Sequence, residues 1–256
     1  MRRMFWGVLM VLLLGGVTFP ALYFYYAKDL PDLSSASAIR ASVASTVEGE
    51  RRGTTVVGTH YEDVRFELWP LSKMPKALVS GVLAMDGCPD YLTARKERGY
   101  PRFKRLFRRW LNNDKAGMPG PGRCQLLYAD MIASALGALD PMHATIADNH
   151  ILTALDVEDL LAYRMSATYY APGVIGAHAG ARRLFKKDLE ELSLSQIGEL
   201  LAAESFFPQF VACKNPGKLK SYRDAAIDRM EAFRFISDTD AIAARAPKKI
   251  TCEIAP

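Results

Sequence analysis

Residues 151–204 carry the pattern that decides the fold, and they read ILTALDVEDLLAYRMSATYYAPGVIGAHAGARRLFKKDLEELSLSQIGELLAAE. Apolar side chains recur there every three to four positions, which is the period of a helix with one buried face. This spacing predicts helices at residues 156–167, 176–186 and 194–204. Ser193 and Gln196 have the spacing of a capping box, so the last of these helices is expected to begin there.

The same helical period continues outside this stretch. It predicts further helices at 74–86, 124–136 and 220–236, with Pro75 in the first turn of the earliest one. Residues 54–71 alternate β-branched and aromatic side chains with charged ones, which predicts two short strands around a polar turn. The expected fold class is therefore mainly α, with a short β hairpin near the start of the domain.

The composition is that of a folded protein with a basic character. The chain has 256 residues, of which 50% are hydrophobic and 24% are charged, and this balance excludes a disordered or collagen-like protein. The formal net charge of +5 favours anionic partners such as phosphates, membrane surfaces or nucleic acid.

The N-terminus is expected to span a membrane. No charged residue lies between Met4 and Ala27, and about twenty apolar residues suffice to cross the hydrocarbon core as a helix. The run ends in an aromatic belt at residues 23–26, and Arg2 and Arg3 favour a cytoplasmic N-terminus. These features predict a single-pass type II anchor in the bacterial inner membrane, with the domain on the periplasmic side. A cleaved signal peptide and a buried helix are the alternatives.

The segment Arg95–Arg109 carries eight Lys or Arg residues against a single acidic one, Glu97. Aromatic side chains interleave with these charges at helical spacing, a pattern typical of helices that contact anionic head groups or lipid-linked phosphates. The candidate binding residues in it are Arg102, Lys104, Arg105, Arg108 and Arg109. The alternative is a solvated charged face over aromatic core residues. Nucleic acid is excluded as a partner, because the anchor places this surface on the other side of the membrane.

The four cysteines, Cys88, Cys124, Cys213 and Cys252, contain no CxxC pair, so the ligand spacing of a metal site is absent. All of them follow the predicted anchor, and in an oxidising compartment they can pair as disulfides in three ways. The alternative is that they are small buried apolar residues.

Several segments, taken in order, resemble one known family. They are YEDVRFELWPLSKMPKALVSGVLAMDGCPDY at 61–91, AGARRLFKKDLEELSLSQ at 179–196, Lys214-Asn215-Pro216, and Arg223 followed by Ile227-Asp228-Arg229-Met230. From about residue 28 to residue 236 the chain is similar to glycosyltransferase family 51, the peptidoglycan transglycosylase domain of class A penicillin-binding proteins and monofunctional transglycosylases. The resemblance implies a lysozyme-like helical lobe, a smaller membrane-proximal lobe, and a role in cell-wall assembly.

The resemblance also implies the domain organisation. A cytoplasmic stub with the anchor occupies residues 1–27, and a Ser-rich connector occupies residues 28–50. The transglycosylase-like domain spans residues 51–240, and residues 241–256 form a C-terminal tail. The same comparison places His178 inside a packed helix, as a structural histidine.

The positions that carry the chemistry of the family differ in this chain. Asp86 stands where the family has its first catalytic Glu, the general base, and Leu161 stands where it has the second. The polar Gly-rich stretch along the donor cleft becomes residues 120–127, in which Arg123 and Gln125 are the candidate substrate-binding side chains.

Two further candidates follow from this comparison. Glu158 lies three residues before Leu161 on the same helical face, so it is a second candidate for a catalytic carboxylate. The alternative is that Glu158 is an acidic residue favoured by the dipole at a helix N-terminus. Cys88 and Cys124 belong to motifs that border one cleft in the family, which implies a disulfide between them.

Three functions remain open. The first is a catalytically degenerate module that binds glycan strands, lipid-linked precursor or another wall-synthesis protein. The second is a divergent glycosyltransferase that polymerises lipid-linked disaccharide with Asp86 as general base. Only this active form would imply a divalent metal, and no other cofactor is expected. The third is a hydrolase, which normally needs two carboxylates at a defined separation, and the sequence shows no such pair.

Overall fold

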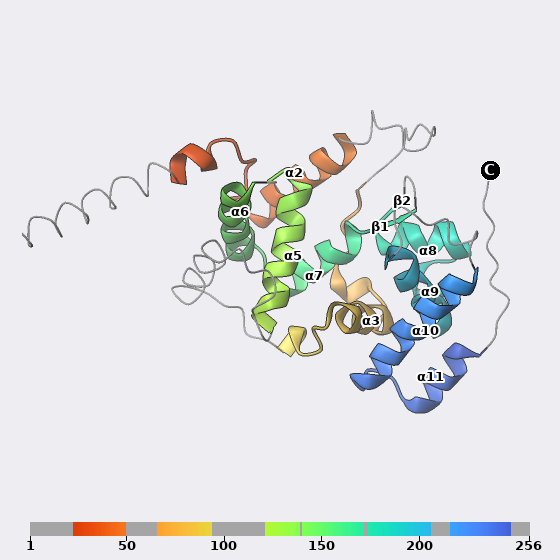
Figure 1. Cartoon of the computed structure of the whole chain (residues 1–256). Coiled ribbons are helices and arrows are strands. Elements are labelled where there is room, and N and C mark those ends of the chain that lie inside the picture. Colours follow the sequence, from red (N-terminus) through yellow and green to blue (C-terminus); the bar gives the residue numbers. More distant parts are fainter. Residues whose placement is uncertain are drawn as a thin grey trace, which may run out of the picture.

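The structure of the chain is a computed structural model that describes residues 23–49, 66–93, 121–138, 140–171, 174–205 and 216–246. This part of the chain is mainly helical, with a small antiparallel hairpin (Figure 1). The helices are α2 (Ala36–Gly49), α3 (Lys76–Asp86), α5 (Pro121–Ala135), α6 (Pro141–Ala154), α7 (Val157–Ser166), α8 (Ala177–Phe185), α9 (Leu194–Ser205), α10 (Pro216–Ala232) and α11 (Asp238–Arg245). Short 3₁₀ helices lie at Leu71–Lys73, Tyr91–Thr93 and Leu189–Glu191, and the strands are β1 (Tyr169–Ala171) and β2 (Val174–Ile175).

Two groups of helices share one hydrophobic core. Helix α9 lies against α3, α8, α10 and α11, while α5 lies against α2, α6 and α7. Figure 1 shows these groups on opposite sides of the molecule, and α7 joins them because it contacts both α5 and α8. The buried apolar side chains of the two groups form a continuous cluster, whose removal from water is the main force that holds the groups together.

The helices expected from apolar periodicity are confirmed as α3, α5, α7, α8 and α9, with small differences at their ends. The predicted capping box is also present. The Ser193 N–H donates to Gln196 Oε1 at 3.0 Å, and the Gln196 N–H donates to Ser193 Oγ at 3.3 Å. Helix α10 begins earlier than expected, at Pro216, because a proline suits a first helical position where its missing N–H costs no bond.

The strand pair predicted at 54–71 is wrong in the part of that segment that the structure describes. Residues 66–70 form no strand, and the residues before them lie outside the described part of the chain. Phe66 stacks on Tyr163 with the ring centroids 6.2 Å apart, and the Trp69 N–H donates to Ser166 Oγ at 3.0 Å. Contacts with α7 thus take the place of strand pairing, and the hairpin that the structure describes is β1–β2.

Ordered structure also extends into both segments that flank the predicted domain. Helix α2 lies in the connector and buries Ile39 and Val43. Helix α11 continues beyond residue 240, where the C-terminal tail was expected to begin, and it buries Ala241 and Ala244 against its neighbours. Helix α6 was not predicted either.

The predicted anchor lies outside the described residues apart from its last turn, residues 23–27, which is helical. The hydroxyl of Tyr23 in this turn lies 2.6 Å from Nε2 of His150 in α6, so the turn contacts the domain. Among the helices that the structure describes, none combines the length and the apolar character that crossing a bilayer requires. The anchor therefore stays a prediction.

A disulfide joins Cys88 to Cys124, as the resemblance implied, with their Cα atoms 6.2 Å apart. Cys88 follows the end of α3 and Cys124 lies in the first turn of α5, so the bond ties the two helix groups together. Cys213 and Cys252 lie outside the described residues.

Replacing both cysteines, Cys88→Ala with Cys124→Ala, is expected to lower the free energy of unfolding by about 3–4 kcal/mol. The physical reason is the added entropy of the unfolded chain, because the bond closes a loop with a sequence separation of 36. Urea unfolding of the full-length chain in detergent, followed by circular dichroism, measures the change. Reducing the parent chain with dithiothreitol should produce the same loss, and equal midpoints for oxidised and reduced parent would contradict the prediction.

Candidate functional site

Arg164 lies at the centre of a buried ion-pair cluster formed by three helices. Its side chain, from α7, is only 8% exposed. Nε lies 3.2 Å from Oδ2 of Asp86 at the end of α3, and Nη2 lies 3.2 Å from Oδ1 of the same carboxylate. Nη2 also forms an ion pair with Oε1 of Glu204, in the last turn of α9. One guanidinium therefore binds two carboxylates that come from distant parts of the chain.

Asp86 lies at the C-terminal end of α3, where a negative charge is favourable only beside a cation. Gly87 adopts φ 69°, in the left-handed region, and this conformation ends the helix directly after Asp86. The carboxylate thus lies at the negative end of the helix dipole, which is unfavourable unless a positive charge is near. Arg164 supplies that charge, while Arg229 donates from Nη1 to the Met85 carbonyl at 2.7 Å and satisfies a free carbonyl of the last turn.

Helix α7 holds Arg164 on its buried face. Asp156 caps the helix by accepting the Asp159 N–H at 2.8 Å, and Leu160, one turn before Arg164, is buried in the core. Thr168 anchors the guanidinium from the other side. Arg164 Nη1 lies 2.5 Å from Thr168 Oγ1, and that hydroxyl donates to the Arg164 carbonyl at 2.6 Å.

Tyr128 brings α5 into the same cluster. Its hydroxyl donates to Oδ2 of Asp86 at 2.9 Å, and its ring packs edge-on against Tyr91 with the centroids 5.0 Å apart. Cys124 lies one turn before Tyr128 on α5, and its disulfide partner Cys88 lies two residues after Asp86. The disulfide therefore keeps Tyr128 close to the carboxylate that it binds.

The environment of the cluster shifts the ionisation of its members. Burial raises the pKa of the Tyr128 hydroxyl, and the Asp86 carboxylate adds to this increase, so Tyr128 is a hydrogen-bond donor at neutral pH. Burial also raises the pKa of Glu204, although Arg164 opposes that effect. Burial alone would lower the pKa of Arg164, but the carboxylates of Glu204 and Asp86 outweigh it and raise the value, so Arg164 stays charged.

The arrangement leaves Asp86 poorly suited to proton transfer. A general base must lie about 2.6–3.2 Å from the proton that it takes, with a lone pair free to receive it. Both oxygens of Asp86 accept hydrogen bonds from Arg164, and Oδ2 accepts a further one from Tyr128. Glu204 supplies a second carboxylate, which the sequence did not reveal, but the guanidinium fills the space between the two acids. A glycosidic oxygen or a water would have to occupy that space.

The other residues predicted for the site lie elsewhere. Glu158 is exposed on the first turn of α7, as expected for an acidic residue near a helix N-terminus, and Leu161 is fully buried. Arg123 is exposed, whereas Gln125 is 3% exposed, so Gln125 points into the protein and not toward a substrate in solvent. The basic residues Arg102, Lys104, Arg105, Arg108 and Arg109 lie outside the described part of the chain.

Sequence reasoning missed Arg164, Glu204 and Tyr128. The positions of the two charged residues could have revealed them. Arg164 lies one turn after Leu160, and Glu204 lies one turn after Leu200. Each charge therefore falls on a helix face that is otherwise apolar. A charge in such a position indicates a buried ion pair, because an unpaired buried charge is strongly destabilising.

No protein-family model matches the chain, and no curated protein matches it. Within the described ranges, no three or more His, Cys, Asp or Glu residues are arranged to hold a metal ion.

Arg164→Met is expected to lower the free energy of unfolding by about 3–5 kcal/mol, because it leaves two carboxylates that are only 13% and 18% exposed without a cation between them. Denaturant unfolding of the full-length chain measures the loss. The triple variant Asp86→Asn, Arg164→Met, Glu204→Gln removes all three charges and should recover most of it.

The matched control is Arg182→Met on α8. The side chains of Arg182 and its partner Asp188 are 62% and 52% exposed, and an exposed pair contributes only about 0–1 kcal/mol. If Arg164→Met costs no more than Arg182→Met, the cluster is not the structural element described above.

Proposed function

We propose that this chain is a membrane-anchored, transglycosylase-like module of bacterial cell-wall assembly that binds its ligand without polymerising it. The ligand is a glycan strand, a lipid-linked precursor or a wall-synthesis protein. The resemblance of residues 61–91 and 179–196 to the peptidoglycan transglycosylase domain motivates the family assignment. A lysozyme-like lobe beside a smaller membrane-proximal lobe is part of the same proposal.

One observation carries the loss of catalysis: Arg164 and Tyr128 occupy the carboxylate of Asp86. Under the resemblance, Asp86 stands at the position of the general base, and the three hydrogen bonds that it accepts leave about one of its four lone pairs for the proton of an acceptor hydroxyl. At the position of the second acid, Leu161 has no proton to exchange and is completely buried. In this proposal Asp86 contributes to stability and not to catalysis.

The proposed location is the periplasmic side of the inner membrane, with a single-pass type II anchor at residues 1–27. The Cys88–Cys124 disulfide supports this part of the proposal, since structural disulfides persist in oxidising compartments such as the periplasm. The apolar run between Met4 and Ala27 supports the anchor.

The second candidate is a divergent glycosyltransferase that polymerises lipid-linked disaccharide with Asp86 as base. The observation in its favour is that the Asp86 side chain remains 13% exposed, so a substrate could approach one edge of the carboxylate. This candidate requires Arg164 to move away from Asp86 during each turnover, and only in this case would a divalent metal be expected.

A polymerisation assay with labelled lipid-linked disaccharide, run on the purified full-length chain in detergent, separates the two candidates. We expect no polymer above background from the parent or from Asp86→Ala, because Arg164 and Tyr128 already bind the carboxylate of Asp86. Polymer made by the parent and abolished in Asp86→Ala would overturn the proposal and establish the transferase.

The same preparation tests binding. Retained binding of the unpolymerised precursor, measured by co-sedimentation with the micelle-bound chain, would identify a recognition module for wall precursors. Absence of binding to both precursor and glycan strands would leave a wall-synthesis protein as the partner.

A further inference from the structure

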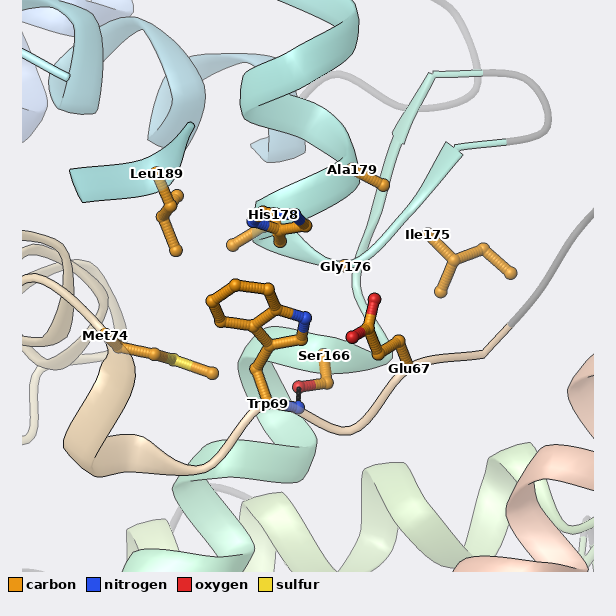
Figure 2. A pocket seen from close by; sticks show the side chains of 10 residues that line it. Glu67, Trp69, Met74, Ser166, Ile175, Gly176, His178, Ala179 and Leu189 are labelled. Carbon is orange, nitrogen blue, oxygen red and sulfur yellow. Dashed lines mark hydrogen bonds between the residues drawn. The ribbon is translucent and has the colours of Figure 1, made fainter. Parts of the chain in front are cut away.

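The cavity beside α8 contributes to packing and does not present a polar ligand site. It measures about 70 Å³ and lies between the segment before α3 and the first turn of α8 (Figure 2). Its lining is mostly apolar, and the ring nitrogens Trp69 Nε1 and His178 Nδ1 are buried out of reach of water. The two rings stack with their centroids 3.8 Å apart and so join α8 to the segment before α3. The outer surface is thus the better candidate for a further partner.

The helical turn at residues 23–27 is bound to α6 by two aromatic contacts. The Tyr23 hydroxyl lies 2.6 Å from Nε2 of His150, near the end of α6. The ring of Tyr26 packs edge-on against the ring of His143, in the first turn of α6, with the centroids 5.2 Å apart. Figure 1 shows this turn beside α6 at the edge of the domain. The turn is therefore held along much of the length of α6.

The connector that follows this turn is pinned to the domain. The carboxylate of Asp32 accepts the Ser34 N–H at 2.9 Å, and its carbonyl accepts a hydrogen bond from the Ser42 hydroxyl of α2 at 3.3 Å. Leu33 is buried in the hydrophobic core, and α2 lies against α5 and α6. The segment that was expected to be a polar tether is thus packed on the same helices as the turn. The turn, the connector and α6 form one unit.

The sequence before the turn determines what α6 faces under the proposed anchor. No charged residue lies between Met4 and Ala27, and residues 23–26 are the aromatic belt expected at the membrane–water interface. If this belt lies at the interface, α6 lies there too, because it touches two of the belt residues. The side chains of Phe24 and Tyr25 in the same turn are 71% and 60% exposed, which is unfavourable in water but suits rings at a membrane surface.

The composition of α6 agrees with this position. The helix contains no Lys, Arg or Glu, and its one acidic residue, Asp148, is buried inside the domain. The hydroxyls of Thr145 and Thr153 each donate to a backbone carbonyl of the preceding turn at 2.7 Å, so these donors need no water. A helix that faces water usually exposes charged side chains. Helix α10 does so with Lys218, Lys220, Asp228 and Arg229.

We propose that α6 lies in the headgroup layer of the bilayer, beside the end of the anchor, and holds the domain against the membrane. The partner is the lipid headgroup surface, which meets the uncharged exposed side of α6. This proposal rests on the anchor of the proposed function and adds the surface through which the domain contacts the membrane. Because the connector is pinned, the domain stays at the bilayer and does not swing on a tether.

The test measures the depth of α6 with a fluorophore on single cysteines. The full-length chain carries Cys213→Ser and Cys252→Ser, keeps its disulfide, and is placed in vesicles of phosphatidylethanolamine and phosphatidylglycerol with a nitroxide-headgroup lipid. A label at Asn149→Cys, exposed on α6, should lose its fluorescence, because the nitroxide quenches at short range. Thr145→Cys, one turn earlier, provides a second reading. A label at Ser221→Cys, exposed on the distant α10, is the matched control and should keep its fluorescence (Figure 1).

A label at Phe24→Cys, in the turn itself, tests the anchor separately. Quenching at both Phe24 and Asn149, with none at Ser221, supports the proposal. Quenching at Phe24 alone overturns it and leaves the anchor in place, whereas no quenching at Phe24 removes the anchor as well. Equal quenching at Ser221 also overturns it, because no particular side of the domain then faces the membrane. So does an Asn149 label that responds to added unlabelled chain and not to the nitroxide lipid, since a second copy then covers α6.

Discussion

The guanidinium of Arg164, held between the carboxylates of Asp86 and Glu204, is the constraint on which the rest of the structure depends. Each of these groups comes from a different helix, and each would destabilise the core if left unpaired. The bonds therefore fix α7 against the ends of α3 and α9. Tyr128 and the disulfide after α3 extend the same constraint to α5, so the two helix groups meet at this cluster.

The same bonds bear on the proposed function. Catalysis of glycosyl transfer needs a carboxylate that can accept a proton and a reachable acid, whereas stability needs each buried charge to be paired. The bonds of Asp86 meet the second requirement, and under the proposed resemblance Leu161 takes the position of the second acid. A recognition role is compatible with such a site, because binding requires shape and polar groups but no proton transfer.

Much of the helical framework could be predicted from the sequence, since α3, α5, α7, α8 and α9 each carry apolar residues at a regular helical period. Helix α11 was not predicted because a segment of eight residues is too short for a helical period to be recognised. The connector helix α2 was not predicted because its exposed face is rich in serine. The cluster itself could not be predicted, because Asp86 and Arg164 are 78 positions apart and only the packed helices bring them together. Helix α3 ends at Gly87, and no local sequence pattern names the partner of the carboxylate before it.

The most direct measurement is the side-chain ¹⁵N spectrum of Arg164 in the full-length chain at neutral pH, assigned with Arg164→Lys. A guanidinium that holds two carboxylates and a threonine hydroxyl cannot rotate freely or exchange its protons rapidly. The account predicts a slowly exchanging Nε–H and separate Nη signals for Arg164, in contrast to the averaged signals of the exposed Arg182. Averaged, rapidly exchanging signals for Arg164 would show that its guanidinium is not held by Asp86 and Glu204, and they would contradict the central claim.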